Sequence, residues 1–220
     1  MLAAVMSHLP SSPMSAPTAP QSCEELLSQM VAFETVNPEF NGPAGGEARL
    51  AAHLEALAQR WGLQTRRCPV AENRFNLLIT TETDPAADWL LFESHLDTVS
   101  IEGMTVPPCT LTTAGDRLHG RGACDTKGSG AAMLWALKDY AKASPRPRNA
   151  GLVFTVDEEA RMLGAQAFAA EELREFLPRL RGMIVGEPTQ LRPVVAHNGA
   201  LRWRTITRGV AAHSSDPTQG

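Results

Sequence analysis

The feature that most limits what this chain can fold into is an apolar run, residues 89–92, that leads into a histidine and an aspartate. Four consecutive apolar residues (Trp-Leu-Leu-Phe) are typical of a strand buried on both faces of an α/β sheet. Ligands of such sheets bind outside the carboxyl ends of the strands, where this sequence has His95 and Asp97. Residues two apart in an extended segment point to the same side, so one can bind a metal while the other orients its imidazole. Taken alone, a His-x-Asp pair after a strand is more often a solvated loop.

Two further apolar runs end in acidic residues. Residues 151–156 lead to an Asp-Glu-Glu triplet at 157–159, and residues 182–186 lead to Glu187. Acidic residues after a strand usually face water, but three like charges at the mouth of a buried strand repel each other, and a bound cation would remove that cost. Because strand ends of one parallel sheet converge on one edge, the recurrence predicts a shared pocket.

A glycine-rich loop, residues 120–130, supplies one more carboxylate. Asp125 has glycines on both sides, and a helix is expected to begin just after it. The alternative is that Asp125 is an ordinary helix cap. The loop has neither a Walker-type order nor a Gly-x-Gly-x-x-Gly, which argues against a phosphate cradle.

Together these patterns predict a divalent metal site. Imidazole combined with carboxylate oxygens suits zinc-like ions. The candidate ligands are His95, Asp125, Glu159 and Glu187.

Helical patterns surround the predicted strands. Ser22 and Glu25 form a capping box for a helix over residues 22–34. A second helix carries Leu50, Leu54, Leu57 and Trp61 on one face and ends at Gly62. Strands alternating with helices predict the α/β class.

Composition excludes several other functions. With 43% hydrophobic and 20% charged residues the chain is an ordinary globular sequence, and its net charge of -4 argues against nucleic acid as a partner. The apolar runs are too short to span a membrane. Four cysteines without Cys-x-x-Cys spacing predict free thiols and a cytoplasmic location. Residues 1–20, rich in Ser, Pro and Ala, are predicted to be a disordered tail.

These motifs, in this order, resemble those of the acetylornithine deacetylase, succinyl-diaminopimelate desuccinylase and glutamate carboxypeptidase family of di-zinc metallohydrolases. The resemblance runs from about Leu26 to Gly220. It implies a zinc-peptidase-like catalytic domain with a central mixed, mostly parallel sheet and helices on both faces, over residues 21–197. Residues 198–220 would begin an α+β lid or dimerisation domain. Ala200 to Arg208 is strand-like in pattern.

The resemblance also implies how the metals are held. His95 and Glu187 would bind one zinc, Glu159 the second, and Asp125 would bridge the two. Each complete subunit would carry two Zn²⁺ ions, for which Co²⁺ is a possible substitute.

Three residues take catalytic roles by the same resemblance. Glu158 would be the general base, and Asp97 would orient His95. His213 matches a lid-domain histidine that, in dimers of the family, reaches a neighbouring active site to stabilise the oxyanion.

This sequence departs from the family pattern in two ways. Ser94, Ser100, Thr126 and Ser129 replace the usual Gly, Pro, Met and Gly, which affects loop geometry more than chemistry. The closing part of the catalytic domain, with one more zinc-binding histidine, has no counterpart, and His197 is too close to Glu187 to be that ligand. The chain therefore resembles an N-terminal fragment, which we expect to be inactive alone.

The implied activity is hydrolysis of the amide bond of a small N-acyl amino acid, in amino-acid biosynthesis, by a homodimer that pairs through its lid domain. Residues 186–194 and 213–217 most resemble the acetylornithine deacetylase branch. A desuccinylase or a glutamate carboxypeptidase-like dipeptidase is the alternative within the family. An alternative of another class is a non-catalytic α/β binding module or an inactive fragment, against which the presence of Glu158 argues.

Overall fold

The computed structural model describes residues 18–196, 198, 199, 201, 203, 205, 206, 208–216 and 218. The predicted tail lies almost entirely outside them. The chain divides into two units, Met1–Pro188 and Thr189–Gly220. The domain boundary predicted at residue 197 stays a prediction. Of the segment 200–208, predicted to be strand-like, residues 201, 203, 205, 206 and 208 are described and none of these is in a strand; the rest lie outside the described residues.

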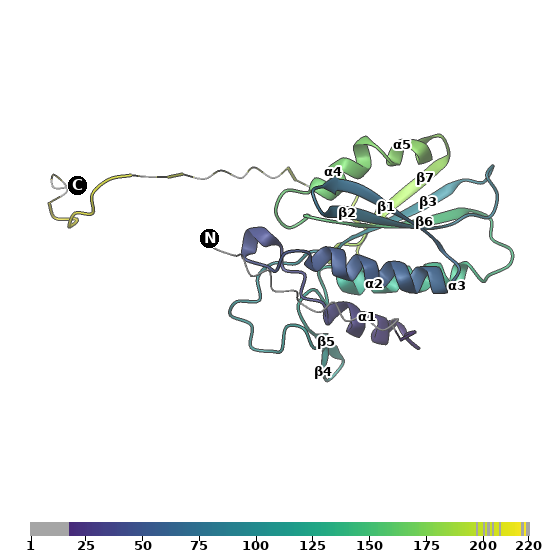
Figure 1. Cartoon of the computed structure of the whole chain (residues 1–220), viewed down its shortest axis with the longest axis horizontal. Helices are drawn as coiled ribbons and strands as arrows, with labels where there is room; N and C mark the ends of the chain where they lie inside the picture. Colours follow the sequence, from purple (N-terminus) through teal and green to yellow (C-terminus); the bar gives the residue numbers. More distant parts are fainter. Residues whose placement is uncertain are drawn as a thin grey trace, which may run out of the picture. The chain divides into compact units, whose positions relative to one another are not determined.

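The first unit is built on a five-stranded sheet (Figure 1) with the order β1-β2-β6-β3-β7. β3 pairs in parallel with both β6 and β7, whereas β2 is antiparallel to β1 and β6. Four strands therefore run in one direction and β2 opposes them, so the predicted mixed, mostly parallel sheet is confirmed. The strands are β1 (Gln64–Ala71), β2 (Arg74–Thr81), β3 (Trp89–His95), β6 (Asn149–Thr155) and β7 (Leu180–Val185).

Helices cover both faces of the sheet (Figure 1), as predicted. One face carries α1 (Cys23–Val31), α2 (Gly46–Arg60) and α3 (Lys127–Tyr140), and the other carries α4 (Leu163–Ala170) and α5 (Leu173–Phe176). Short 3-10 turns lie at η1 (Pro38–Phe40) and η2 (Leu177–Arg179). A separate hairpin pairs β4 (Thr112–Ala114) with β5 (Arg117–His119).

Local sequence signals explain where the first two helices begin and end. The Ser22 hydroxyl accepts a hydrogen bond from the Glu25 N–H (3.1 Å), while Glu25 reaches back to the N–H of Gln21 rather than that of Ser22 (2.6 Å). The α2 stripe Leu50, Leu54 and Leu57 is fully buried. Gly62 has φ +78°, the left-handed conformation that ends helices.

Two apolar clusters form the core. The larger joins α1, α2 and α3 to the sheet and includes Leu26, Leu54 and Leu134. The smaller lies under α4 and α5, where Phe168 and Phe176 pack on Leu78 and Leu91. Burial on both faces is why β6 is apolar throughout its inner length.

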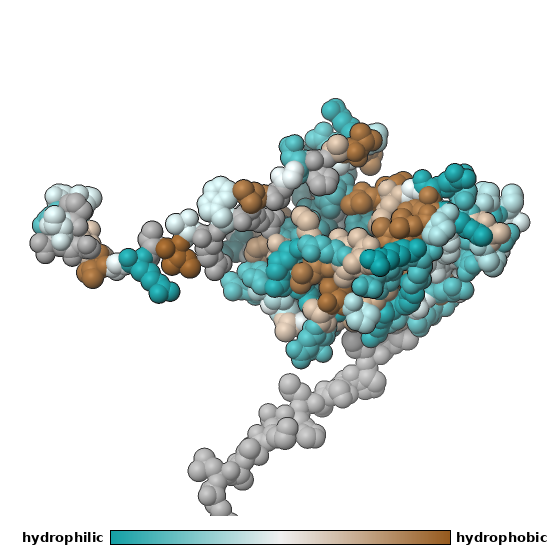
Figure 2. Space-filling model, turned by 90° about the horizontal axis from the view of Figure 1, so that it is seen from above, coloured by the Kyte–Doolittle hydropathy of each residue, from teal (hydrophilic) through white to brown (hydrophobic). Residues whose placement is uncertain are grey.

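The surface is mixed in character. Figure 2 shows apolar areas interspersed with polar ones on the face seen from above. Ile184 and Val185 of the edge strand β7 are about half exposed. All four cysteines are unpaired, as predicted. Within the described part of the chain, no helix combines the length and apolar character needed to cross a membrane.

The two ends of the connection between β6 and α4 lie close together, with the backbone of Gly164 against that of Val156. Gly164 N–H donates to the Val156 carbonyl (2.9 Å), and Asn76 links the same two residues through its side-chain amide (Nδ2 to Gly164 O, 2.8 Å; Oδ1 from Val156 N, 3.2 Å). A Cβ at position 164 would lie 2.5 Å from the Val156 nitrogen. These contacts fix both ends of the segment that contains Asp157, Glu158 and Glu159.

We expect Gly164→Ala to lower the free energy of unfolding by about 1–3 kcal/mol, because backbone must shift to admit the methyl group. The matched control is Gly182→Ala, where nothing lies within 4 Å of an added Cβ. That control should change stability little or raise it slightly. Urea denaturation measures both, and equal effects of the two substitutions would contradict the packing argument.

Candidate metal centre

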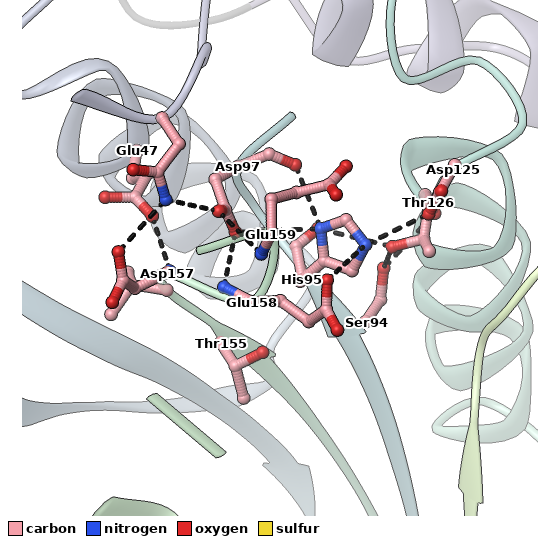
Figure 3. A network of polar contacts seen from close by, with 12 residues as sticks. Glu47, Ser94, His95, Asp97, Asp125, Thr126, Thr155, Asp157, Glu158 and Glu159 are labelled. Carbon is pink, nitrogen blue, oxygen red and sulfur yellow. Dashed lines mark hydrogen bonds and ion pairs between the residues drawn. The ribbon is translucent and has the colours of Figure 1, made fainter. Parts of the chain in front are cut away.

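Parallel pairing brings three predicted site segments to one edge of the sheet. His95 is the last residue of β3, and its Cα partner on β6 is Thr155, two residues before Asp157. Glu187 comes two residues after the end of β7. The predicted convergence of strand ends is therefore present, and Figure 3 shows Asp125 and Glu158 beside His95.

His95 lies at the centre of the cluster and is 1% exposed. Its Nε2 is 3.1 Å from Asp125 Oδ1 and 3.9 Å from both Glu158 Oε2 and Glu187 Oε1. The side chains of Asp125 and Glu187 are 48% and 40% exposed, so the cluster is open to solvent on their side. The imidazole forms its base and the carboxylates its rim.

The arrangement fits a metal ion. His95, Asp125 and Glu187 each offer one ligand atom, and these atoms lie within 4.8 Å of one another. One imidazole nitrogen and two carboxylate oxygens are donors that zinc accepts. Glu159 contributes no atom to this group of three, so its place on a second metal stays a prediction.

The raised pKa values of carboxylates at this edge of the sheet indicate that a bound cation would be favourable here. Burial raises the pKa of Glu159 to about 7. The nearby His95 lowers this pKa, and the negative charge of Asp125 raises it. Burial likewise raises the pKa of Glu187 to about 6. Burial lowers the pKa of His95, but the hydrogen bond to Asp125 and the surrounding carboxylates together raise it to about 9. Clustered carboxylates hold protons that a divalent cation would displace.

Asp97 holds His95 through its main chain. The Asp97 carbonyl accepts a hydrogen bond from His95 Nδ1 at 2.9 Å, whereas the carboxylate lies 3.7 Å away. Since a carbonyl only accepts, Nδ1 carries the proton, which leaves the Nε2 lone pair for a metal. The Asp97 carboxylate accepts instead from the main-chain N–H groups of Glu158 and Glu159. The orienting role of Asp97 stays a prediction; in this geometry the contact to the ring nitrogen is made by its carbonyl, and its carboxylate contacts the acidic segment.

Asp125 does not cap the helix that begins after it. The helix α3 begins at Lys127, its N-cap is Thr126, and the Thr126 side chain makes no capping hydrogen bond. The Asp125 carboxylate points to His95 instead. The alternative prediction, that Asp125 is an ordinary helix cap, is therefore wrong.

Three departures from the family pattern contact each other. The hydroxyls of Ser94 and Thr126 are 2.8 Å apart, and Ser129 donates to the carbonyl of Thr126 (2.8 Å) or of Gly186 (2.6 Å). They link the end of β3, the Asp125 loop and the residue before Glu187.

Sequence patterns do not single out three residues that lie behind this cluster. Asn37, Glu47 and Arg74 form hydrogen bonds to Asp97 or Asp157. They come from a loop, a helix and a strand, and each is unremarkable in its own segment. The one available signal is that Glu47 and Arg74, two residues of opposite charge, lie near the start of α2 and at the start of β2.

With this geometry in place, comparison with known proteins identifies the class. The model of Peptidase family M20/M25/M40 matches residues 91–217, more than half of the chain. The chain belongs to this family, as the motifs had indicated.

Among curated relatives, the acetylornithine deacetylase of Photorhabdus laumondii is 34% identical over 200 residues, which are 89% of this chain and 50% of that protein. A probable succinyl-diaminopimelate desuccinylase of Staphylococcus epidermidis is 30% identical over 199 residues, covering 89% of this chain and 46% of that protein. The chain spans about half the length of the curated relatives it matches.

Among solved structures, an M20 family metallo-carboxypeptidase from Sulfolobus solfataricus aligns with a TM-score of 0.65 at 17% identity. The alignment covers 76% of this chain and 37% of that one. This likeness supports the fold.

Two further histidines, His213 and His197, follow Glu187 in the sequence. His213 belongs to the second unit, where it is exposed and its Nδ1 is 2.8 Å from the Ser215 hydroxyl. Its role at the active site stays a prediction. His197 lies outside the described residues.

We expect zinc affinity to rise with pH between about 6 and 9, because His95, Glu159 and Glu187, with pKa values near 9, 7 and 6, must give up their protons to bind metal. Each displaced proton contributes about a tenfold gain per pH unit below its pKa. Competition with a chromophoric chelator at pH 6, 7 and 8 measures the affinity. Glu187→Gln should weaken binding and the exposed Glu171→Gln should not; an affinity independent of pH would contradict the assignment.

Proposed function

We propose that the protein containing this chain is a zinc-dependent hydrolase of amide bonds in small N-acyl amino acids. The observation that carries the proposal is the convergence of His95, Asp125 and Glu187 on one open edge, with Glu158 beside them. Family membership supports the same reaction class. Two zinc ions per subunit, with Co²⁺ as a substitute, are part of the proposal, with Asp125 between them and Glu159 on the second.

Metal ions bound here would polarise the scissile carbonyl and make a water molecule acidic. The chain's own residues supply the rest. Glu158, with a side chain 29% exposed, stands 3.9 Å from His95 Nε2, where it can take a proton from water and pass it to the leaving amine. His95, fixed by the Asp97 carbonyl, keeps one nitrogen turned to the metal side. Burial of the His95 side chain shields that residue from bulk water and strengthens its contacts with the carboxylates.

The proposed substrate is N-acetylornithine or a close analogue. Support comes from the Photorhabdus laumondii relative, whose name is acetylornithine deacetylase, and from the resemblance of residues 186–194 to that branch. A desuccinylase is the second candidate, favoured by the Staphylococcus epidermidis relative at similar coverage. A dipeptidase is the third.

Several finer points complete the proposal. His213 would reach the active site of a second subunit, in a homodimer formed through a lid domain that begins at residues 198–220. The protein would act in the cytoplasm, in keeping with four unpaired cysteines. A non-catalytic binding module is the competing hypothesis, and the position of Glu158 beside His95 disfavours it, because metal binding alone does not need that residue.

We expect Glu158→Gln to reduce kcat by about 10²–10⁴, because the general base is lost, while zinc content stays unchanged. The measurement combines metal analysis with hydrolysis of N-acetylornithine and N-succinyl-diaminopimelate. Both are measured on the protein that contains this chain.

Glu171→Gln is the control, since Glu171 is exposed and lies outside the cluster. Wild-type protein that binds no metal would overturn the enzyme proposal and favour the binding module. Metal binding without hydrolysis of either substrate would leave the metal centre standing and reject the substrate class.

A further inference from the structure

Behind the metal centre, a buried network holds the Asp-Glu-Glu segment by its backbone. Three consecutive main-chain N–H groups each donate to a carboxylate. Asp157 N–H donates to Glu47 Oε1 (2.8 Å), Glu158 N–H to Asp97 Oδ1 (3.0 Å) and Glu159 N–H to Asp97 Oδ2 (3.1 Å). The position of Glu158 therefore depends on where Asp97 and Glu47 are held (Figure 3).

Asn37 joins the two ends of this arrangement. Its Nδ2 donates to Asp97 Oδ2 at 2.7 Å and to Asp157 Oδ1 at 3.0 Å, and the residue is fully buried. Its Oδ1 accepts from the Glu39 N–H at 3.0 Å, which fixes which end of the amide faces the carboxylates. Both hydrogens of the amide are thus used, one on each acidic residue.

The backbone of Asn37 is itself anchored. Its N–H donates to the Thr98 carbonyl at 2.9 Å, and its carbonyl accepts from Phe40 (2.8 Å) and Gly42 (3.2 Å). A side chain on a fixed backbone, with every polar atom used, can hold its partners to one geometry.

Charge on the Asp157 side is balanced by Arg74. Its guanidinium donates to both carboxylate oxygens of Glu47 (2.8 and 2.7 Å) and to Asp157 Oδ1 (2.9 Å). Arg161 adds a second contact to Asp157. The three buried carboxylates Asp97, Asp157 and Glu47 are therefore joined to one another through Asn37, Arg74 and main-chain N–H groups.

We propose that Asn37 is a positioning residue for the hydrolysis: its side-chain amide links Asp97 to Asp157 and thereby sets the place of the Glu158 carboxylate relative to His95. The inference rests on the proposed function, because it assigns Asn37 to the same reaction. Both amide hydrogens of Asn37 go to Asp97 and Asp157, so it acts on Glu158 through Asp97 and the loop.

The first test is hydrogen exchange, which needs no activity. In the full gene product, Asn37→Ala should raise amide exchange in the peptide covering residues 157–162, because the Asp97 carboxylate loses a partner. Asn37→Ser, which keeps one donor, should have a smaller effect. Unchanged exchange in both variants would overturn the proposal.

The matched control is Asn149→Ala. Asn149 is equally buried, but it lies at the opposite end of β6, where its side chain accepts from Thr83 and Asp84. That substitution should lower the melting temperature and leave kcat, KM and exchange at 157–162 unchanged. A similar loss of kcat in both buried-asparagine variants would reduce Asn37 to a structural role and overturn the proposal.

The second test is kinetic. Asn37→Ala should lower kcat about 10- to 100-fold, the range typical of residues that orient a metal site, with KM and zinc content little changed. In a Glu158→Gln background the same substitution should have almost no further effect, because the group it positions is already disabled. An equal fold-loss in both backgrounds would contradict positioning through Glu158.

The two tests separate this inference from the proposed function. If wild type hydrolyses none of the substrates while Asn37→Ala still raises amide exchange at residues 157–162, the proposed function fails and the link to catalysis fails with it. The structural role of Asn37 in holding this segment would then still stand. If wild type is active and exchange rises with kcat unchanged, the proposed function stands and the positioning inference alone is overturned.

Discussion

The site depends on one constraint, the parallel pairing of β3 with β6 on one side and β7 on the other. Parallel strands end at the same edge, so the residues just beyond each strand are brought together whatever their separation in sequence. His95, Glu158 and Glu187 come from three strand ends, and both glutamates lie 3.9 Å from the same His95 nitrogen. A single antiparallel strand in this central position would send one of these ends to the opposite edge.

Carboxylates gathered at one edge of the sheet repel each other. The two sides of the Asp-Glu-Glu segment differ in how this repulsion is compensated. On the buried side, Asn37 and Arg74 donate to Asp97, Asp157 and Glu47. On the open side the described side chains around His95 are carboxylates, and the pKa values of Glu159 and Glu187 rise, chiefly through burial. That asymmetry is the physical argument for a metal ion on the open side.

Much of the fold was predictable because it rests on local patterns. Ser22 caps α1, the Leu50–Leu57 stripe makes α2 amphipathic, and apolar runs mark β3, β6 and β7. The cluster that could hold a metal ion was predictable for a related reason: His95, Asp125 and Glu187 each lie next to an element whose end the sequence marks. The resemblance to a known family added proposed roles that spacing alone does not give, those of Glu158 and His213.

The sequence alone determined the class of fold, the elements that carry the site and the identity of the candidate ligands, because periodicity and strand-end chemistry are local properties. The tertiary structure decided which atoms meet. It paired His95 Nδ1 with the Asp97 carbonyl, left the Asp97 carboxylate to the Glu158 and Glu159 amides, and brought Asn37 behind them from far along the chain. Such contacts depend on the packing of separate elements, which no local pattern encodes.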